Sequence, residues 1–425
     1  MKGVLWSIAL RSAWFRRGTL ALVVLSIALS SFLLLALERV RTDIRASFSQ
    51  AVSGTDLVVG ARSSPVQLML YAVFRIGGAS HGISMDSVRA VAAHRAVAWV
   101  VPLALGDSHR GRPVLGTTTE YFERFLYGDR QPLAFAAGRP FAGTLDGLYE
   151  AVIGAEVADA LGYTLGQRIT LSHGLGEAVS AQHADKPFTV VGVLARTGTP
   201  VDRTVHVSLQ AIEAIHLDWA GGAPLPGLRI APEQARKFDL EPRQVTAALV
   251  GLKSRAAVFM VQRFVGDHDG EALMAVLPGV ALDEMWEVIG VGERALLGIS
   301  AMVALVSLVG LVAVVLAGLG ARRRELAVLR AVGASPRHVL WLLALEGFLV
   351  SAAGVVLGAL GTVALVAGAG PWVQQQFGIA LQGSAPGATQ WALAGALLAA
   401  GMLASLLPAL RAYRLSLADG LSPPA

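Results

Sequence analysis

Four stretches of the chain are apolar over about the 20 residues that an α-helix needs to cross a bilayer. We predict them to be transmembrane helices, at residues 19–37, 294–321, 339–369 and 391–410. The third is interrupted by one charged residue, Glu346. Between the first and second stretches, residues 38–293 have the mixed polar and apolar composition of a soluble domain. The pattern therefore predicts a four-helix membrane protein with one large insertion.

The insertion alternates between strand-like and helix-like patterns. Short β-branched runs bounded by Gly, Pro and Asp predict strands at Leu57–Val59, Val152–Gly154, Arg168–Leu171, Phe188–Val193 and Thr204–Val207. Helical spacing predicts helices at Ser84–His94, Glu156–Leu161, Pro242–Leu252 and Arg255–Val265. We also expect the first span to extend through Arg45–Phe48, and residues from Asp283 to run directly into the second span. The insertion is thus predicted to be a mixed α+β domain with a stalk helix at each end.

Composition supports membrane insertion and excludes several kinds of site. Hydrophobic residues make up 54% of the 425 residues and charged residues 15%, whereas a soluble domain carries about 25% charge. The mean hydropathy is +0.58, so a wholly soluble or disordered chain is excluded. The chain has no cysteine, which excludes disulfides, cysteine-ligated zinc, iron–sulfur clusters and thiol nucleophiles.

Basic residues flank the predicted spans on one side, the side expected to be cytoplasmic. They precede the first span, lie between the second and third, and follow the fourth: Lys2, Arg11, Arg16 and Arg17; Arg322–Arg324, Arg330 and Arg337; Arg411 and Arg414. The connection 370–390 carries no charge. We therefore predict cytoplasmic termini (an amphipathic segment 1–18 and a tail 411–425), a cytoplasmic connection 322–338, a short outer loop 370–390 and an extracytoplasmic domain 38–293. No small-x-small cleavage site precedes Glu38, so the first span is expected to be a retained anchor.

The insertion offers little recognisable chemistry. Asp107-Ser108-His109 contains the residue types of a catalytic triad, but adjacent residues cannot form triad geometry, and we interpret them as a loop. Asp267-His268-Asp269-Gly270 fails the spacing of a calcium loop. Eight of the nine histidines are scattered through the insertion. A zinc site formed by their convergence stays open, although exposed or core histidines are the default interpretation.

The cytoplasmic connection carries the strongest pattern. We predict a short helix from Arg322 to Val332 that Gly333 ends. Ser335 then caps the next helix and Pro336 takes its first position. Leu326, Leu329 and Arg330 follow i, i+3, i+4 spacing, which gives the short helix an apolar and a basic edge. Because this helix joins two spans directly, a force applied to it would move both.

Several stretches resemble the FtsX/MacB-type permeases of ABC transporters. Residues 322–337 resemble the coupling segment of that family, and 408–421 (PALRAYRLSLADGL) resembles its tail. The insertion resembles its extracytoplasmic core domain, at GRPF (138–141), AVIGAEVA (151–158), LGQRITL (165–171), FTVVGVLA (188–195) and GTPVDRTVHV (198–207). The four-span layout, the large first outer loop and the coupling segment together make the resemblance specific.

The resemblance implies a multi-pass subunit of the bacterial inner membrane with a periplasmic core domain. Such permeases pair with a second permease copy or a sister permease and with two cytoplasmic ATPase subunits. The ATPase is implied to grip the coupling segment, here Arg323, Arg324, Glu325, Leu326, Ala327, Leu329, Arg330, Gly333, Ala334, Ser335 and Pro336. ATP-driven closure is implied to move the outer domain, a process called mechanotransmission, so that a lipoprotein, peptide or similar cargo is exported or extracted.

The chain itself lacks the loop that holds nucleotide phosphates. That loop is Gly-x4-Gly-Lys-Ser/Thr, and none of the four lysines follows a glycine. We therefore expect a non-catalytic subunit with no cofactor of its own, and ATP and Mg²⁺ bound by the partner ATPase. The alternatives are an FtsX-like regulator that relays ATPase motion to an outer effector protein, and an anchored outer enzyme. Gly354, Gly358 and Gly361 fit either a dimer seam or close packing within one subunit.

Overall fold

The structure is a computed structural model that describes residues 17–78, 81–174, 183–220, 223–225, 227–331, 333–377, 381 and 385–414. Most of the predicted amphipathic segment 1–18 and of the tail 411–425 lies outside the described residues. The chain divides into two compact units. We call residues 1–43, 290–372 and 381–425 the helical unit, and residues 44–289 and 373–380 the outer domain.

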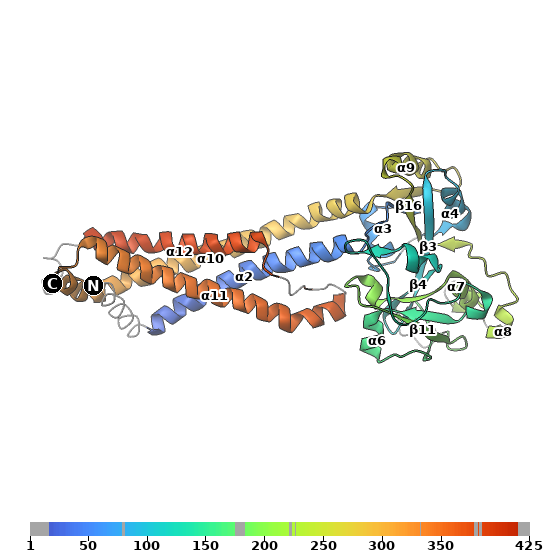
Figure 1. Ribbon diagram of the computed structural model, residues 1–425, viewed down its shortest axis with the longest axis horizontal. Helices are drawn as coiled ribbons and strands as arrows, with labels where there is room; N and C mark the ends of the chain where they lie inside the picture. The colour runs from blue at the N-terminus through green and yellow to red at the C-terminus, as the bar shows by residue number, and fades with distance from the viewer. Residues whose placement is uncertain are drawn as a thin grey trace. The chain divides into compact units, whose positions relative to one another are not determined.

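Four long helices account for the four predicted spans (Figure 1). They are α2 (Arg17–Gln50), α10 (Pro278–Ala331), α11 (Pro336–Phe377) and α12 (Ala388–Arg414). Each is long and apolar enough to cross a membrane. The extension of the first span through Phe48 and the continuous entry into the second span are both confirmed. The outer loop is shorter than predicted, because α11 continues past Gly370 and accommodates Pro371 before it ends at Phe377.

The helical unit is packed through small residues. Ideal Cβ atoms built on Gly354 and Gly358 of α11 would come within 3.2 Å of the Val24 carbonyl oxygen and 2.8 Å of the Ala28 carbonyl oxygen of α2. The backbones of the two helices are therefore in direct contact, as small residues permit in membranes. Of the two interpretations of these glycines, close packing within one subunit is the one that the contacts support.

An eleven-stranded sheet forms the frame of the outer domain, in the order β17-β1-β16-β3-β4-β12-β8-β11-β7, with β10 paired to β3 and β9 to β11. The strands of this sheet are β1 (Leu57–Ala61), β3 (Val97–His109), β4 (Arg112–Thr117), β7 (Phe135–Gly138), β8 (Glu150–Ile153), β9 (Arg168–Ile169), β10 (Ser172–His173), β11 (Phe188–Leu194), β12 (Val205–Ser208), β16 (Ala247–Leu252) and β17 (Leu273–Val276). Six further short strands pair in twos: β2 (Ile83–Ser84) with β15 (Gln244–Val245), β5 (Leu126–Tyr127) with β6 (Gln131–Pro132), and β13 (Trp219–Ala220) with β14 (Ala223–Pro224).

Strand β3 links the two halves of the sheet. Its first part pairs with β16 and its last part with β4 and β10, and a register shift separates Leu105 from Ser108. Helices α4 (Met85–Ala92) and α9 (Val258–Gly266) lie at one end of the sheet, and α6 (Ala155–Leu161), α7 (Leu209–His216) and α8 (Pro232–Ala235) lie at the other (Figure 1). The remaining short elements are α3 (Pro65–Ala72), α5 (Glu120–Arg124) and the 3₁₀ turns η1 (Leu145–Gly147), η3 (Pro200–Arg203) and η4 (Arg255–Ala257).

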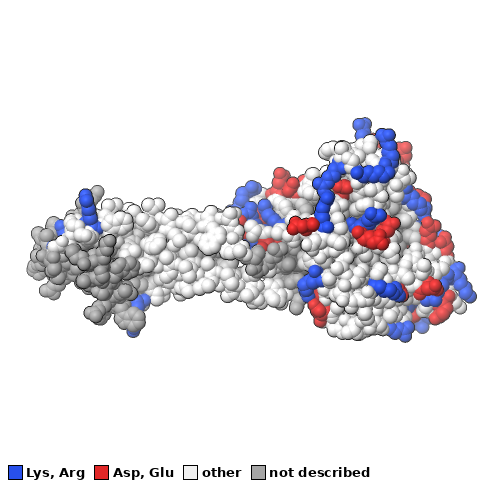
Figure 2. Space-filling model, viewed as in Figure 1, with Lys and Arg blue, Asp and Glu red and all other residues white. Residues whose placement is uncertain are grey.

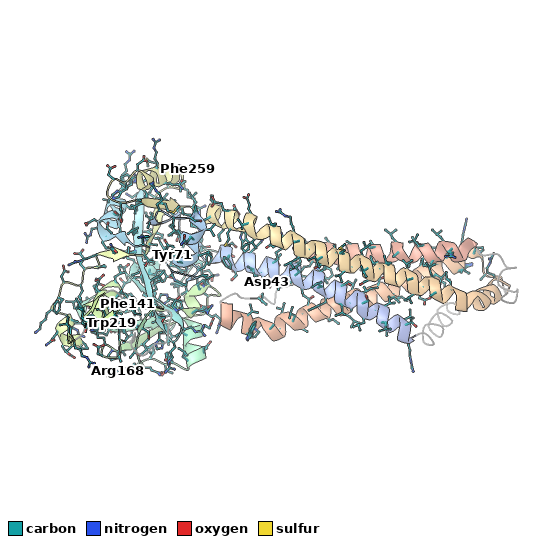
Figure 3. All side chains as sticks on the ribbon, turned by 180° about the vertical axis from the view of Figure 1, so that it is seen from behind. Asp43, Tyr71, Phe141, Arg168, Trp219 and Phe259 are labelled. Atoms are coloured by element: carbon teal, nitrogen blue, oxygen red, sulfur yellow. The ribbon has the colours of Figure 1, made fainter. Side chains whose placement is uncertain are left out.

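The interior of the outer domain consists of three hydrophobic clusters around this sheet. Figure 3 places Tyr71 and Phe141 inside the domain, and both side chains are buried. Phe259 on α9 instead projects from the surface and is 71% exposed. The first cluster also contains Ala281 and Met285 from the first turns of α10, so the start of this long helix is part of the outer-domain core.

Most local predictions in the outer domain are confirmed, and one helix is wrong. The five predicted strands correspond to β1, β8, β9, β11 and β12, and the helices at Ser84–His94, Glu156–Leu161 and Arg255–Val265 correspond to α4, α6 and α9. Residues 242–252 form β15 and β16 instead of a helix. Five of the six residues of β16 are buried, so the strand lies inside the sheet and its sequence is a continuous apolar run. Such a run carries no alternation that would separate a strand from a buried helix.

Candidate functional site

The predicted coupling segment lies at the end of helix α10 and in the turn that follows it. Arg323, Arg324, Glu325, Leu326, Ala327, Leu329 and Arg330 belong to the last turns of α10, which ends at Ala331. The separate short helix predicted from Arg322 is therefore wrong, because no break divides it from the second span. The reason is local: residues 321–331 contain neither Gly nor Pro and consist mainly of Ala, Arg and Leu, which are strong helix formers.

The turn after α10 has the predicted geometry. Gly333 adopts φ +102°, a conformation that favours glycine, and its amide donates to the carbonyl of Arg330 at 3.1 Å. Pro336 begins α11. The amide of Ser335 donates to Nδ1 of His338 at 3.2 Å, and the Ser335 hydroxyl lies 2.8 Å from the same nitrogen. Ser335 thus occupies the position before α11, as predicted, and its carbonyl oxygen accepts a hydrogen bond from the His338 amide at 2.9 Å.

The described residues between α10 and α11 are few. Ala334 and Ser335 are the residues between Gly333 and the first residue of α11, Pro336. Helical geometry places positions 326, 329 and 330 on one side of α10. The segment thus joins two membrane helices through one tight turn, while its contact with an ATPase stays a prediction.

Helix α10 is hydrogen-bonded to α2 at two positions within the helical unit. Near its middle, the hydroxyl of Ser307 lies 3.0 Å from that of Ser26 and 2.5 Å from that of Ser30. Further along the two helices, Arg41 donates to Glu293 at 2.9 Å and to Glu38 at 3.0 Å. Hydroxyl hydrogen bonds of this kind hold helices together in membranes. The two helices are therefore linked side by side and are expected to move together.

The outer-domain end of α10 is anchored by aromatic contacts. The Trp286 ring packs edge-on against Phe48 of α2, with the ring centroids 5.6 Å apart. The Arg45 guanidinium lies 5.2 Å from the centroid of the Trp286 ring, in the arrangement of a cation–π contact. The division between the two units falls between Ile289 and Gly290. Gly290 and Gly292, which begin the part of α10 that belongs to the helical unit, are both helical.

Charge is distributed very unevenly over the two units. In the view of Figure 2, Lys, Arg, Asp and Glu side chains are spread over the outer domain, and the described middle of the membrane helices shows none. The buried polar side chains inside the predicted spans are all hydroxyls: Ser30, Ser31, Ser300, Ser307, Ser351, Thr362 and Ser405. Among the described residues of the spans, Glu346 of α11 is charged and half-buried.

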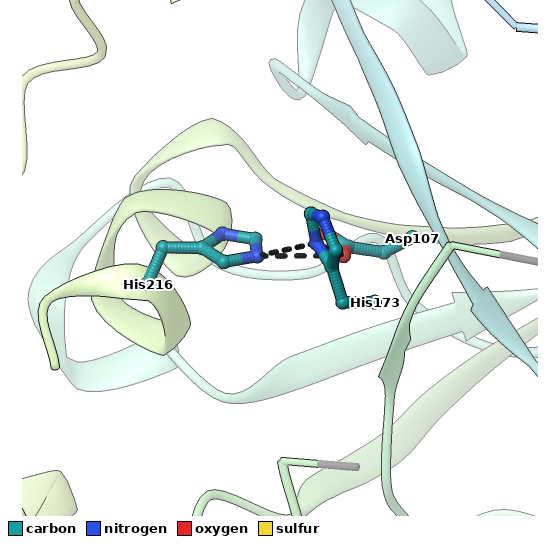
Figure 4. Close-up of side chains that lie close together, drawn as sticks. All are labelled: Asp107, His173 and His216. Atoms are coloured by element: carbon teal, nitrogen blue, oxygen red, sulfur yellow. Dashed lines mark hydrogen bonds and ion pairs between the residues drawn. The ribbon is translucent and has the colours of Figure 1, made fainter. Parts of the chain in front are cut away.

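The outer domain brings together residues that are far apart in the sequence. Asp107 lies near the end of β3, His173 on β10 and His216 at the end of α7 (Figure 4). Asp107 Oδ1 lies 3.2 Å from His173 Nδ1 and 3.5 Å from His216 Nε2, and these two nitrogens lie 3.2 Å apart. The loop predicted at 107–109 is wrong, because these residues belong to β3 and pair with β10 and β4.

Electrostatics in this cluster follow from burial and from the short contacts. Burial alone raises the pKa of Asp107, but hydrogen bonds from His173 and His216 outweigh it and lower the pKa to about 2. Burial lowers the pKa of His216, yet its contacts with Asp107 give a net increase. Burial, together with the positive charge of His216, lowers the pKa of neighbouring His183 to about 4. The carboxylate thus stays ionised and attracts positive charge to this point.

Sequence reasoning did not find this cluster. Positions 107, 173 and 216 follow no ligand spacing, and only the pairing of β3 with β10 brings His173 beside Asp107. His109, in contrast, is buried and hydrogen-bonded by its two ring nitrogens to Thr170 and Tyr163. It is a core histidine, as the default interpretation expects.

Two family models match successive parts of the chain. The model of the MacB-like periplasmic core domain matches residues 18–262, and that of the FtsX-like permease C-terminal region matches residues 297–417. A search of curated proteins finds no significant relative.

Two of the solved structures that are similar to this chain each match little more than half of it. One is the periplasmic region of MacB from Actinobacillus actinomycetemcomitans, at 12% identity and a TM-score of 0.34, covering 56% of this chain and 94% of that one. The other is the extracellular domain of the noncanonic ABC-type transporter YknZ from Gram-positive bacteria, at 15% identity and a TM-score of 0.31, covering 52% of this chain and 98% of that one.

Proposed function

The chain belongs to the family of FtsX-like permeases with a MacB-like periplasmic core domain, and from this premise we propose that it transmits the motion of a separate cytoplasmic ATPase to its outer domain. Members of this family are multi-pass membrane subunits of ABC transporters. Our proposal adds that this chain binds two ATPase subunits through residues 323–336. It also adds that both termini are cytoplasmic and that the chain resides in the inner membrane of a bacterium as a dimer or with a sister permease.

The proposal rests on one observation, the continuity of helix α10. This helix runs without interruption over 54 residues, a length of about 80 Å at 1.5 Å per residue. Its first turns belong to the outer-domain core and its last turns contain the coupling residues. A displacement at one end of a hydrogen-bonded helix reaches the other end without passing through a loop. The links to α2 at Ser307 and Glu293 would carry the same displacement to a second helix.

We propose that a lipoprotein, peptide or similar cargo is moved at the outer domain. The alternative, an FtsX-like regulator, differs in what the outer domain binds: a cargo for a transporter and an effector protein for a regulator.

The first test is purification of the intact protein in mild detergent, followed by identification of co-purifying chains and an ATPase assay. We expect a stoichiometric ATPase whose activity depends on this chain, and ATP and Mg²⁺ bound by that partner. Purification of a folded four-span protein without any ATPase, under conditions that preserve related assemblies, would contradict the proposal.

A variant of the coupling segment makes this test specific. Replacement of Leu326 and Leu329 together by Asp should abolish co-purification of the ATPase, because two charges would occupy the apolar edge predicted at the end of α10. Membrane insertion should be unchanged. Arg411→Gln, at an exposed residue near the end of α12, is the matched control and should retain the ATPase. Full retention by the double variant would refute the assignment of this segment.

The proposed orientation is tested by reporter fusions. Gly111 is exposed in the turn between β3 and β4, and Ser335 lies in the turn between α10 and α11. Exposed turns tolerate insertions best, so neither fusion should prevent folding. A reporter active only outside the cytoplasm should be active at Gly111 and inactive at Ser335. The reverse pattern would overturn the topology.

A further inference from the structure

The cluster of Asp107, His173 and His216 has the dimensions of a metal site. Its three facing atoms are one carboxylate oxygen and two imidazole nitrogens, separated by 3.2, 3.2 and 3.5 Å. In a tetrahedral zinc site with bonds of 2.0–2.1 Å, neighbouring ligand atoms lie about 3.3 Å apart. The triangle therefore matches one face of such a tetrahedron, and all three atoms can contact one ion without rearrangement of the backbone.

The hydrogen bond on the far side of His216 leaves the inner nitrogen available as a ligand. Nδ1 of His216 lies 2.8 Å from the carbonyl oxygen of Ile212, and a carbonyl oxygen only accepts, so Nδ1 carries the proton. In a neutral imidazole, Nε2 then presents its lone pair. That lone pair faces the oxygen of Asp107 and the nitrogen of His173. Metal-bound histidines are oriented in the same way, with the outer N–H donating to a backbone carbonyl.

Protons or a metal ion could occupy the space between these three atoms. Protons on His173 Nδ1 and His216 Nε2 would both be donated to Asp107, and the two ring nitrogens, 3.2 Å apart, would then face one another without a bond. A metal ion accepts electron pairs from all three groups. His216 is also the last residue of α7, where the negative end of the helix dipole favours a cation.

Neighbouring His183 provides a second, independent indication of a missing ligand. Its side chain is fully buried, and neither ring nitrogen has a hydrogen-bond partner among the described residues. Its ring centroid lies 5.0 Å from that of His216 and 4.3 Å from that of Trp219. Buried polar groups without partners are rare in folded proteins. A water molecule on a metal ion would give His183 the hydrogen-bond partner that it lacks.

The surroundings allow an ion to enter and be held. Asp107 is buried with 4% of its side chain exposed, whereas His173 and His216 are 39% and 25% exposed. The site is therefore open to solvent on its histidine side. The positive charge of Lys186, near His183, is neutralised by two carboxylates: its Nζ lies 2.6 Å from Asp218 Oδ1 and 3.3 Å from Asp185 Oδ2. Glu213 adds a further negative charge near His216. The local balance thus favours a cation.

We propose that Asp107, His173 and His216 bind a Zn²⁺ ion on the outer domain, with a water molecule as the fourth ligand and His183 as its hydrogen-bond partner. Two imidazoles and one carboxylate are ligands that zinc uses, and three protein ligands leave a position open. The site is separate from the coupling segment and does not depend on the proposed transport function. It would make the outer domain a sensor or carrier of zinc.

Titration of the metal-free, full-length protein with ZnCl₂, in competition with a coloured chelator, tests the proposal. We expect one zinc per chain. His173→Gln and His216→Ala should each weaken binding by more than about 100-fold, since each removes a ligand, and His183→Ala by about 10- to 100-fold, the usual effect of a residue that supports a ligand. His81→Ala, at an exposed histidine elsewhere in the domain, is the control and should bind zinc like the wild type.

Two further measurements separate loss of the site from loss of the fold. His173 is the most exposed of the three ligands, so His173→Gln should unfold at the wild-type temperature in the absence of metal, and zinc should raise the unfolding temperature of the wild type only. Co²⁺ should give the intense visible absorption of a four-coordinate site in the wild type and not in His216→Ala. Equal zinc affinity of the wild type and His173→Gln, or the absence of one-to-one zinc binding by the wild type, would overturn the proposal.

Discussion

The two units of the chain differ in the residues that make their closest buried contacts. In the helical unit, the closest contacts are made where a side chain is absent, as at Gly354 and Gly358, and the buried polar groups inside the predicted spans are hydroxyls. In the outer domain, fully buried ionisable groups are present, and Lys186 pairs with Asp218 at 2.6 Å. Packing in the membrane thus depends on room for two backbones, whereas the outer domain depends on partners for its buried charges.

This difference follows from the two solvents. Lipid tails are as apolar as leucine side chains, so helices in a membrane gain little from burying apolar surface and rely on close packing. A water-soluble domain gains stability from apolar burial and can hold buried charges where each has a partner. We therefore expect the helical unit to be most sensitive to added volume and the outer domain to changes in its polar groups.

The largest predicted effect is that of added volume between α2 and α11. A Cβ atom on Gly358 would come within 2.6 Å of Ser31 Cβ, 2.7 Å of the Phe32 amide nitrogen and 2.8 Å of the Ala28 carbonyl oxygen. Two of these atoms belong to the backbone and cannot move aside as a side chain can. Gly358→Leu should therefore destabilise the helical unit by about 3 kcal/mol or more, measured as the loss of thermal stability of the protein in detergent.

A second glycine of the same helix provides the control. An added Cβ on Gly368 would meet no atom within 4 Å, so Gly368→Leu should leave the thermal stability nearly unchanged or raise it slightly, because glycine disfavours helices. Equal destabilisation by the two substitutions would show that helix α11 is sensitive to leucine along its whole length, and that contact with α2 is not the cause.

The sequence predicted the four spans, and it left a zinc site in the outer domain open without naming its residues. The four spans follow from local composition, and the small-residue spacing at Gly354, Gly358 and Gly361 identified a packing surface. The turn at Gly333 and Ser335 was also predicted, because glycine conformation and helix capping depend on residues adjacent in the chain. The choice between a dimer seam and α2 required the structure, since it depends on a partner far away in sequence.

Long-range pairing explains what was missed in the outer domain. Residues 242–252 were predicted to be helical because their apolar run is compatible with both a helix and a buried strand, and only the neighbours of β16 distinguish the two. The Asp107, His173 and His216 cluster depends on β3 pairing with β10 and on the position of α7. Three residues separated by 66 and 43 positions carry no spacing that a motif search would detect.

The next effect concerns His206, a buried histidine in the outer domain without a carboxylate contact. It is fully buried, and its ring lies 5.4 Å from the Tyr121 ring and 5.8 Å from the Phe122 ring. Burial, together with the charge of Arg75, lowers the pKa of His206 to about 3. Between pH 6.5 and 3 the unfolded chain binds a proton that the folded protein excludes, so the free energy of unfolding falls as the pH is lowered through this range.

His206→Phe should remove this part of the pH dependence. The wild type should lose about 2.3 kcal/mol more stability than the variant between pH 6.5 and 4.5, because the slope rises from half of about 1.4 kcal/mol per pH unit at pH 6.5 towards that full value at lower pH. Urea unfolding in metal-free buffer, followed by tryptophan fluorescence, measures it. His81→Gln alters an exposed histidine and should retain the wild-type slope. If His206→Phe also keeps that slope, then His206 is protonated in the folded protein or is not buried.

The smallest effect tests how helix α7 is held, and with it the position of His216. Ser208 precedes α7, and its hydroxyl accepts a hydrogen bond from the Ala211 amide at 3.1 Å. Removing such an N-cap costs about 1 kcal/mol, so Ser208→Ala should lower the stability of the outer domain by that amount in urea unfolding. Thr119 precedes α5 without a side-chain bond, and Thr119→Ala should have almost no effect.

The same variant tests what sets the position of His216. The cap fixes only the first turn of α7, whereas the His216 ring is hydrogen-bonded to the carbonyl oxygen of Ile212 in the last turn. Ser208→Ala should therefore change the affinity for zinc less than His183→Ala does. A larger loss of zinc affinity would mean that the start of α7, and not the hydrogen bond to Ile212, sets the position of His216.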